Sequence, residues 1–171
     1  MRNAVVEALV TSGQLRTFVG EAAVLSIEPL CGIPVEVIGE APLPWANPPV
    51  GIALVSLADA AGSEFQGVAW VGGEFAALAA VTEVLVGERP SSEDDELLQD
   101  AIRELTNIVA GRMQERLHSA GLRLSLGLPV FVGGARSLNV GASLVNGAAV
   151  LVQLGLPGEP VLAVGFAAKE A

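Results

Sequence analysis

The most regular hydrophobic pattern in the chain runs from Ser91 to Gly121. Apolar residues recur there three and four positions apart, which is typical of an amphipathic α-helix with one face on a protein core. Ser91 or Ser92 can cap the first amide groups, and the acidic residues at positions 93–96 suit the positive end of the helix dipole. Gly121 can adopt the left-handed conformation in which many helices end. The predicted apolar face comprises Leu98, Ala101, Ile102, Leu105, Ile108, Val109 and Met113.

Polar residues occupy the opposite face of this predicted helix. Glu104 and Asn107 are three positions apart, so a carboxylate and a carboxamide would project side by side. Gly111 follows one turn later and would leave a gap in the wall of side chains, at a cost of about 1 kcal/mol relative to alanine. Such a gap suits the close approach of another backbone. From spacing alone, a solvated face that carries Glu and Asn by chance is the simpler interpretation.

The N-terminal part of the chain shows shorter patterns of both kinds. Residues 3 to about 20 have the apolar spacing of a helix, and residues 33–38 alternate like a half-buried strand. Residues 40–49 hold several prolines around Trp45 and therefore predict a loop.

The remaining patterns complete the set of elements. Residues 50–57 and 64–71 predict two strands of a hairpin, and residues 74–86 predict a further helix. The Asn146-Gly147 pair is typical of a tight turn between two strands. This order predicts an α+β fold, with long helices packed on a mostly antiparallel sheet, in a single domain spanning residues 1–171. The strands expected after the long helix cover residues 122–132, 138–144, 148–154 and 161–166.

Composition narrows the possible locations and partners. Hydrophobic residues make up 51% of the chain and the mean hydropathy is +0.57, but prolines and charged residues interrupt the most apolar stretches before they reach membrane-spanning length. The chain does not open with a basic segment and a long apolar run, so we expect a cytoplasmic protein. The net charge of −10 would repel phosphate backbones, which argues against binding to nucleic acid.

Two single residues exclude several kinds of chemistry. Cys31 is the only cysteine, so the chain can form neither an internal disulfide nor a thiolate metal cluster. His118 is the only histidine, which disfavours Ser-His or Cys-His nucleophiles and zinc sites with several histidines. We therefore expect no metal and no cofactor of the protein's own.

Two segments together carry a family resemblance. Asp95-Glu96-Leu97 with residues 101–111 resembles the signature helix of the CheC/CheX chemotaxis phosphatases, in which Glu-x-x-Asn lies on an exposed face and Gly often follows four residues later. Residues 126–134, LGLPVFVGG, resemble the proline-containing strand and glycine turn that follow this helix in CheX. The resemblance implies two long helices related by pseudo-symmetry over the sheet. CheC can carry the motif on both helices, but the first predicted helix here reads Glu7-Ala8-Leu9-Val10, so we expect one site and a CheX-like arrangement.

The resemblance also implies a function. CheX-like proteins dephosphorylate a phosphorylated CheY-like response regulator, whose receiver domain supplies the phospho-aspartate, a lysine and the Mg²⁺ ion. On this reading Glu104 and Asn107 are the catalytic residues, and Gly111 allows the partner to approach. Asp100 shares the face but is interpreted as solvated surface, while Arg103 differs from the small or acidic residue that the family often has there.

Two further expectations follow from the family. The resemblance implies a homodimer joined through sheet edges. The alternative function is a catalytically silent binding or scaffold module in chemotaxis or two-component signalling, which would keep the fold and the helix without the reaction.

Overall fold

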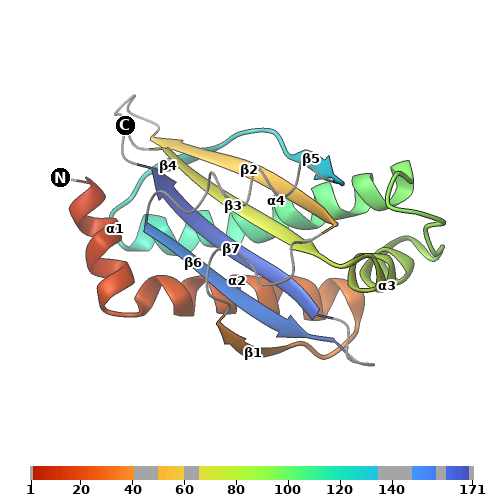
Figure 1. Cartoon of the computed structure of the whole chain (residues 1–171). Coiled ribbons are helices and arrows are strands. Elements are labelled where there is room, and N and C mark those ends of the chain that lie inside the picture. The colour runs from red at the N-terminus through yellow and green to blue at the C-terminus, as the bar shows by residue number, and fades with distance from the viewer. Residues whose placement is uncertain (1, 41–49, 60–65, 135–147, 157–160, 170–171) are drawn as a thin grey trace.

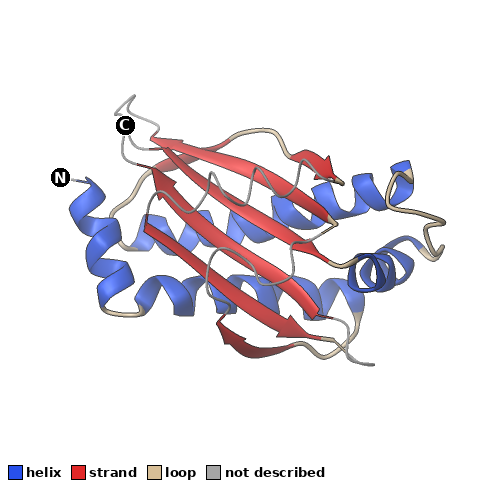
Figure 2. Ribbon diagram, in the orientation of Figure 1, coloured by secondary structure: helices blue, strands red, loops and turns tan. Residues whose placement is uncertain are grey.

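The fold has two layers, with helices lying against one face of a seven-stranded sheet (Figures 1 and 2). The computed structural model describes residues 2–40, 50–59, 66–134, 148–156 and 161–169. The helices are α1 (Arg2–Thr11), α2 (Gln14–Cys31), α3 (Phe75–Val86) and α4 (Glu96–Ser119). The strands are β1 (Glu36–Glu40), β2 (Gly51–Asp59), β3 (Gln66–Gly73), β4 (Leu124–Leu126), β5 (Val130–Gly133), β6 (Ala148–Gly155) and β7 (Val161–Lys169).

Neighbouring strands of the sheet all run antiparallel. The order across the sheet is β1-β6-β7-β3-β2-β4, and β5 also pairs with β2, so β4 and β5 form one edge and β1 the other. The predicted hairpin is present as β2 and β3, with Leu54 opposite Trp70. The predicted α+β class with long helices on an antiparallel sheet is therefore confirmed.

The two long helices divide the covered face of the sheet between them. α4 packs on β2 and β3, and α2 packs on β6 and β7, with the two helices in contact along their sides (Figure 1). The core between the layers is closed by fully buried side chains from both, such as Leu57 and Phe166 from the sheet and Leu15 and Leu105 from the helices. Burial of each such side chain stabilises the fold by about 1.5–3 kcal/mol. The packing between the helices and the sheet therefore holds α4 in place on β2 and β3.

The N-terminal region differs from the single helix predicted over residues 3 to about 20. Gly13 has φ 75°, a left-handed conformation that separates α1 from α2. α2 then continues through Gly20 to Cys31, with Pro29 in its last turn. Gly20 does not end the helix but is buried within it, and a Cβ atom there would lie 3.3 Å from Val37 Cγ2 of β1. The glycine thus serves the close approach of a strand.

Other predicted boundaries shift or lie outside the described residues. The strand expected over 33–38 begins only at Glu36, after Pro34, and the one expected over 122–132 is divided into β4 and β5. α3 matches the helix predicted over 74–86, with Gly87 at its C-terminal end. The proline-rich loop around Trp45, the strand expected over 138–144 and the Asn146-Gly147 turn lie outside the described residues. None of the helices in the described part of the chain is long and apolar enough to cross a membrane.

Candidate functional site

The site is built on α4, which packs its apolar face on the sheet as predicted. Leu98, Ile102, Leu105 and Met113 are almost completely buried. Ile108 differs from the prediction, because it is only half-buried at the border of that face. Because the apolar face of α4 is packed on the sheet, its opposite side lies on the surface. The packing also fixes the direction in which the polar residues of α4 project.

The N-terminus of α4 is capped by Asp95 and not by Ser91 or Ser92. One carboxylate oxygen of Asp95 accepts a hydrogen bond from the Leu97 amide at 3.0 Å. The other accepts from the Ser91 amide at 2.8 Å and from the Ser91 hydroxyl at 3.0 Å. These bonds, led by that of the Ser91 backbone, lower the pKa of Asp95. The serine thus orients the cap residue, and only Glu96 of the acidic run lies in the first turn.

The C-terminus of α4 ends at the predicted glycine. Gly121 has φ 93°, and its amide donates to the His118 carbonyl at 2.9 Å. The Leu122 amide donates to the Leu117 carbonyl, also at 2.9 Å. This pair of bonds is the Schellman motif. It turns the chain directly into β4, which therefore runs back beside α4.

The outer face of α4 carries the predicted site residues together. Glu104 is exposed, whereas Asn107 and Gly111 are half-buried. Asp100 lies one turn before Glu104 with its side chain 71% exposed, and its carboxylate accepts a hydrogen bond from the Arg103 guanidinium. Arg103, the residue at which the sequence departs from the family pattern, is thus paired with Asp100 on the same helix.

The strand β4 lies beside the site. A Cβ atom on Gly111 would lie 4.0 Å from Leu126 Cδ1, and the Gln114 side-chain amide donates to the Leu124 carbonyl. α4 also contacts β5, the next strand along the same edge of the sheet. Gly111 therefore lies on the side of α4 that faces β4, and Asn107 lies one turn before it on the same helix.

The structure corrects which helix corresponds to α4. The long helix beside α4 is α2, so the pseudo-equivalent of the motif lies there and not at Glu7-Ala8-Leu9-Val10 of α1. Aligning the buried faces of α2 and α4 places Glu21 at the position of Glu104 and Val24 at that of Asn107. Because Val24 stands where the motif has Asn, α2 lacks the complete motif. A single Glu-x-x-Asn site, on α4, therefore remains the prediction.

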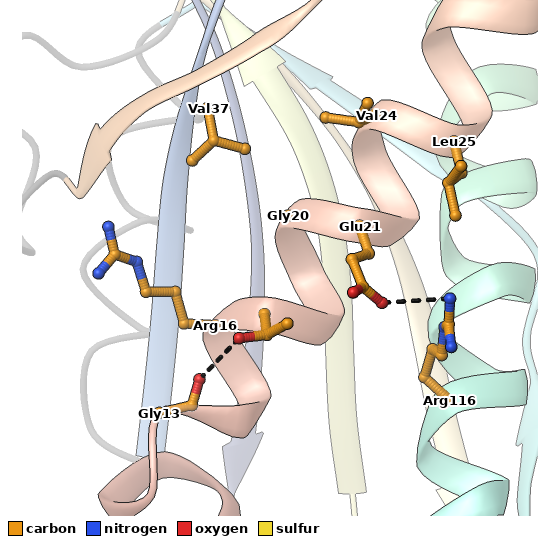
Figure 3. Close-up of a pocket in the computed structure, with 9 residues that line it drawn as sticks. Gly13, Arg16, Gly20, Glu21, Val24, Leu25, Val37 and Arg116 are labelled. Carbon is orange, nitrogen blue, oxygen red and sulfur yellow. Dashed lines mark hydrogen bonds and ion pairs between the residues drawn. The ribbon is translucent and has the colours of Figure 1, made fainter.

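A cavity of about 650 Å³ lies along α2, with lining residues also from β1 and α4 (Figure 3). Within it Glu21 of α2 pairs with Arg116 of α4, with 3.1 Å between the carboxylate oxygen and the guanidinium nitrogen. The cavity is lined by Gly13, Arg16, Thr17, Gly20, Glu21, Val24, Leu25, Val37 and Arg116. Glu104, Asn107 and Gly111 do not line this cavity.

Comparison with known proteins identifies the family. The sequence of residues 54–144, more than half of the chain, matches the family described as chemotaxis phosphatase CheX. This region includes α4, β4 and β5 and therefore the whole candidate site. The chain belongs to the chemotaxis phosphatase CheX family, as the resemblance predicted. No curated protein matches the sequence.

Solved structures share the fold at low sequence identity. The CheX protein of Desulfovibrio desulfuricans has a TM-score of 0.71 at 13% identity, covering 91% of this chain and 99% of its own. CheX of Vibrio vulnificus gives 0.67 at 13% identity, covering 86% and 91%. CheX of Borrelia burgdorferi, in a complex with CheY, BeF₃ and Mg²⁺, gives 0.65 at 21% identity, covering 88% and 94%.

Proposed function

We propose that this protein dephosphorylates the phospho-aspartate of a CheY-like receiver domain, with Glu104 and Asn107 as its catalytic residues. Membership of the chemotaxis phosphatase CheX family supports the class of activity. The observation that carries the assignment to these residues is their common position on the outer side of α4, one turn apart. An open pair of polar side chains suits a reaction in which the partner provides the rest of the active site.

Asn107 would position the attacking water. Hydrolysis joins the water oxygen to phosphorus while the bond from phosphorus to the aspartate oxygen breaks, which releases inorganic phosphate and the free carboxylate. Such a reaction needs mainly alignment and charge stabilisation, so no nucleophile from this chain is required. A carboxamide both donates and accepts hydrogen bonds, and it can therefore hold a water molecule in a defined orientation.

Glu104 would set the docking position of the partner. Its exposed carboxylate can pair with the lysine of the receiver's active site, and such complementarity fixes the register of a complex. Gly111 lies one turn further along and would give the receiver's loops room to approach the helix backbone.

The Mg²⁺ ion would belong to the receiver and not to this chain. Within the described residues, no group of three or more His, Cys, Asp or Glu side chains could hold a metal ion. The ion would neutralise charge on the phosphoryl group when the complex forms. The residues of this chain would contribute the water-positioning amide and the docking carboxylate.

The test is Asn107→Ala with a phosphorylated receiver as substrate. Loss of one positioning contact should lower kcat by about 100-fold or more while leaving receiver affinity nearly unchanged. Leu105→Ala, on the buried side of the same turn, serves as the stability control and should cost about 2–5 kcal/mol. If Asn107→Ala acts at the wild-type rate on a verified substrate, the proposed mechanism is wrong. A wild-type protein that binds receivers without any turnover would instead be the catalytically silent module.

A further inference from the structure

The edge of the sheet beside α4 contains a change of register. Leu57 of β2 pairs with Leu126 of β4, whereas Leu54 pairs with Val130 of β5. Two residues of β2 therefore face three residues of the edge segment, Gly127, Leu128 and Pro129. One extra residue in one strand of an antiparallel pair is a β-bulge, a device that redirects side chains.

The residues of the bulge suit this geometry. The Gly127 amide donates to the Ser56 carbonyl at 2.8 Å, and a Cβ atom on Gly127 would lie 2.1 Å from Ser56 Oγ. Only glycine allows this approach while the neighbouring side chain stays in place. Pro129 has no amide proton, so the interruption of the ladder leaves no donor unpaired at that position.

The bulge exposes apolar side chains. Leu128 is 86% exposed, the largest value among the exposed large hydrophobic residues in the described part of the chain, and Val130 is 55% exposed. Isolated exposed leucines are common. Leu128 differs because an ordered bulge directs it outward, between strands that are otherwise held to β2.

The bulge also borders the candidate site. Leu126, its first flanking residue, faces the open position at Gly111, and Gln114 of α4 bonds to the strand that leads into it. Leu128 follows Leu126 by two residues and therefore lies next to the segment that packs beside the site helix, whereas Val130 pairs with Leu54 on the sheet face away from α4.

We propose that Leu128 is the apolar part of the surface on which the phosphorylated receiver docks. This inference rests on the proposed function, because only a receiver seated over Glu104 and Asn107 would extend to the neighbouring edge segment that holds Leu128. A second copy of the chain suits the bulge less well, since the interrupted ladder and Pro129 disfavour pairing with another strand. The receiver would present an apolar patch beside its phosphorylation site.

The test compares Leu128→Ser with Leu30→Ser. Leu30 is 43% exposed on α2 and provides a matched change outside the α4–β4 edge. Each protein is assayed across a range of phosphorylated receiver concentrations and for binding to the receiver loaded with BeF₃⁻ and Mg²⁺. Leu128→Ser should raise KM and Kd about tenfold with kcat and Tm unchanged, which is the loss expected when a buried leucine contact is removed. Leu128→Met should largely restore affinity, and Leu30→Ser should behave as wild type.

The outcomes separate this inference from the proposed function. If the wild type dephosphorylates the receiver and Leu128→Ser has unchanged KM and Kd, the docking role of the bulge is wrong while the proposed function stands. If the wild type neither binds nor dephosphorylates receivers, the proposed function fails and the docking surface falls with it. If Leu128→Ser alters the oligomeric state, the bulge contacts another copy and the inference is overturned.

Discussion

Glu104 and Asn107 project from one side of α4 into different surroundings. Glu104 is exposed, whereas Asn107 is half-buried. A half-buried amide loses part of its conformational freedom before the partner arrives, which favours a positioning role. An exposed carboxylate retains its freedom and its solvation, which favours a role in the encounter and in docking.

This contrast predicts the effect of Glu104→Ala. Removal of one interfacial charge should weaken receiver binding by about 1–3 kcal/mol, with a smaller effect on kcat at saturation. Tm should change little, because surface substitutions usually alter stability by less than about 0.5 kcal/mol. Titration of BeF₃⁻-loaded receiver at several salt concentrations measures the effect. Equal Kd values for the variant and the wild type, with reduced kcat, would assign Glu104 to the chemical step instead.

Asp95 gives a second prediction at the scale of a single residue. Its pKa is lowered in the folded protein by the Ser91 amide, the Leu97 amide and the Ser91 hydroxyl. A lowered pKa means that the ionised cap stabilises the fold above the unfolded pKa of about 3.9. This stabilisation is lost as pH falls through the lower folded value. Asp95→Ala should therefore reduce Tm at neutral pH, and the difference from wild type should shrink in acid.

The control for the cap is its neighbour Asp94, which is exposed. Asp94→Ala removes the same charge from the region before α4 without removing the hydrogen bonds of the cap. Thermal unfolding of both variants between acidic and neutral pH separates the two effects. A Tm difference for Asp95→Ala that is independent of pH, or equal to that for Asp94→Ala, would contradict the role of the ionised cap.

At the scale of elements, the face of α4 was predictable and its cap was not. Burial of a stripe of apolar residues on the sheet requires helical spacing, so the sequence predicts both the helix and the side on which Glu104 lies. Ser91, Ser92 and Asp95 are all suitable cap residues, and only the folded geometry selects Asp95. The bulge escapes prediction for a similar reason, because its extra residue is defined by the register with β2.

α2 shows how a glycine can mislead. A glycine in a periodic segment can mark a helix end, and the helix predicted from apolar spacing stops near Gly20. Its actual role depends on Val37 of β1, which is distant in sequence and approaches the helix at that point. The predicted helix therefore ends before Glu21 and Val24, the residues of α2 that correspond to Glu104 and Asn107.

Gly111→Ala distinguishes a docking role from a structural role for the site glycine. A Cβ atom there would meet Leu126 Cδ1 at 4.0 Å, an ordinary contact, so the chain itself does not require glycine. The substitution should raise stability by up to about 1 kcal/mol through helix propensity. It should also weaken receiver binding, because the new methyl group would occupy the space beside the helix backbone that the receiver's loops are proposed to fill. Denaturant unfolding and receiver titration measure both quantities, and unchanged affinity would remove Gly111 from the docking surface.

At the scale of the whole molecule, the two edges of the sheet differ in their surroundings. The β4–β5 edge adjoins α4 and is interrupted by the bulge, so it forms part of the candidate site. The opposite edge is β1, where Val37 is 42% and Ile38 54% exposed. Apolar side chains on the edge strand of a sheet favour association with another chain. We therefore place the expected homodimer contact at β1.

This placement predicts both the size and the stoichiometry of the assembly. Light scattering at micromolar concentrations should give twice the 17.4 kDa mass of one chain. Ile38→Lys should shift that mass toward the monomer by placing a charge on the contact, whereas Leu128→Ser at the other edge should leave it unchanged. Because β1 lies across the sheet from α4, both copies keep Glu104 and Asn107 accessible. Each dimer should then bind two BeF₃⁻-loaded receivers, and a monomeric wild type or a single receiver per dimer would contradict the β1 contact.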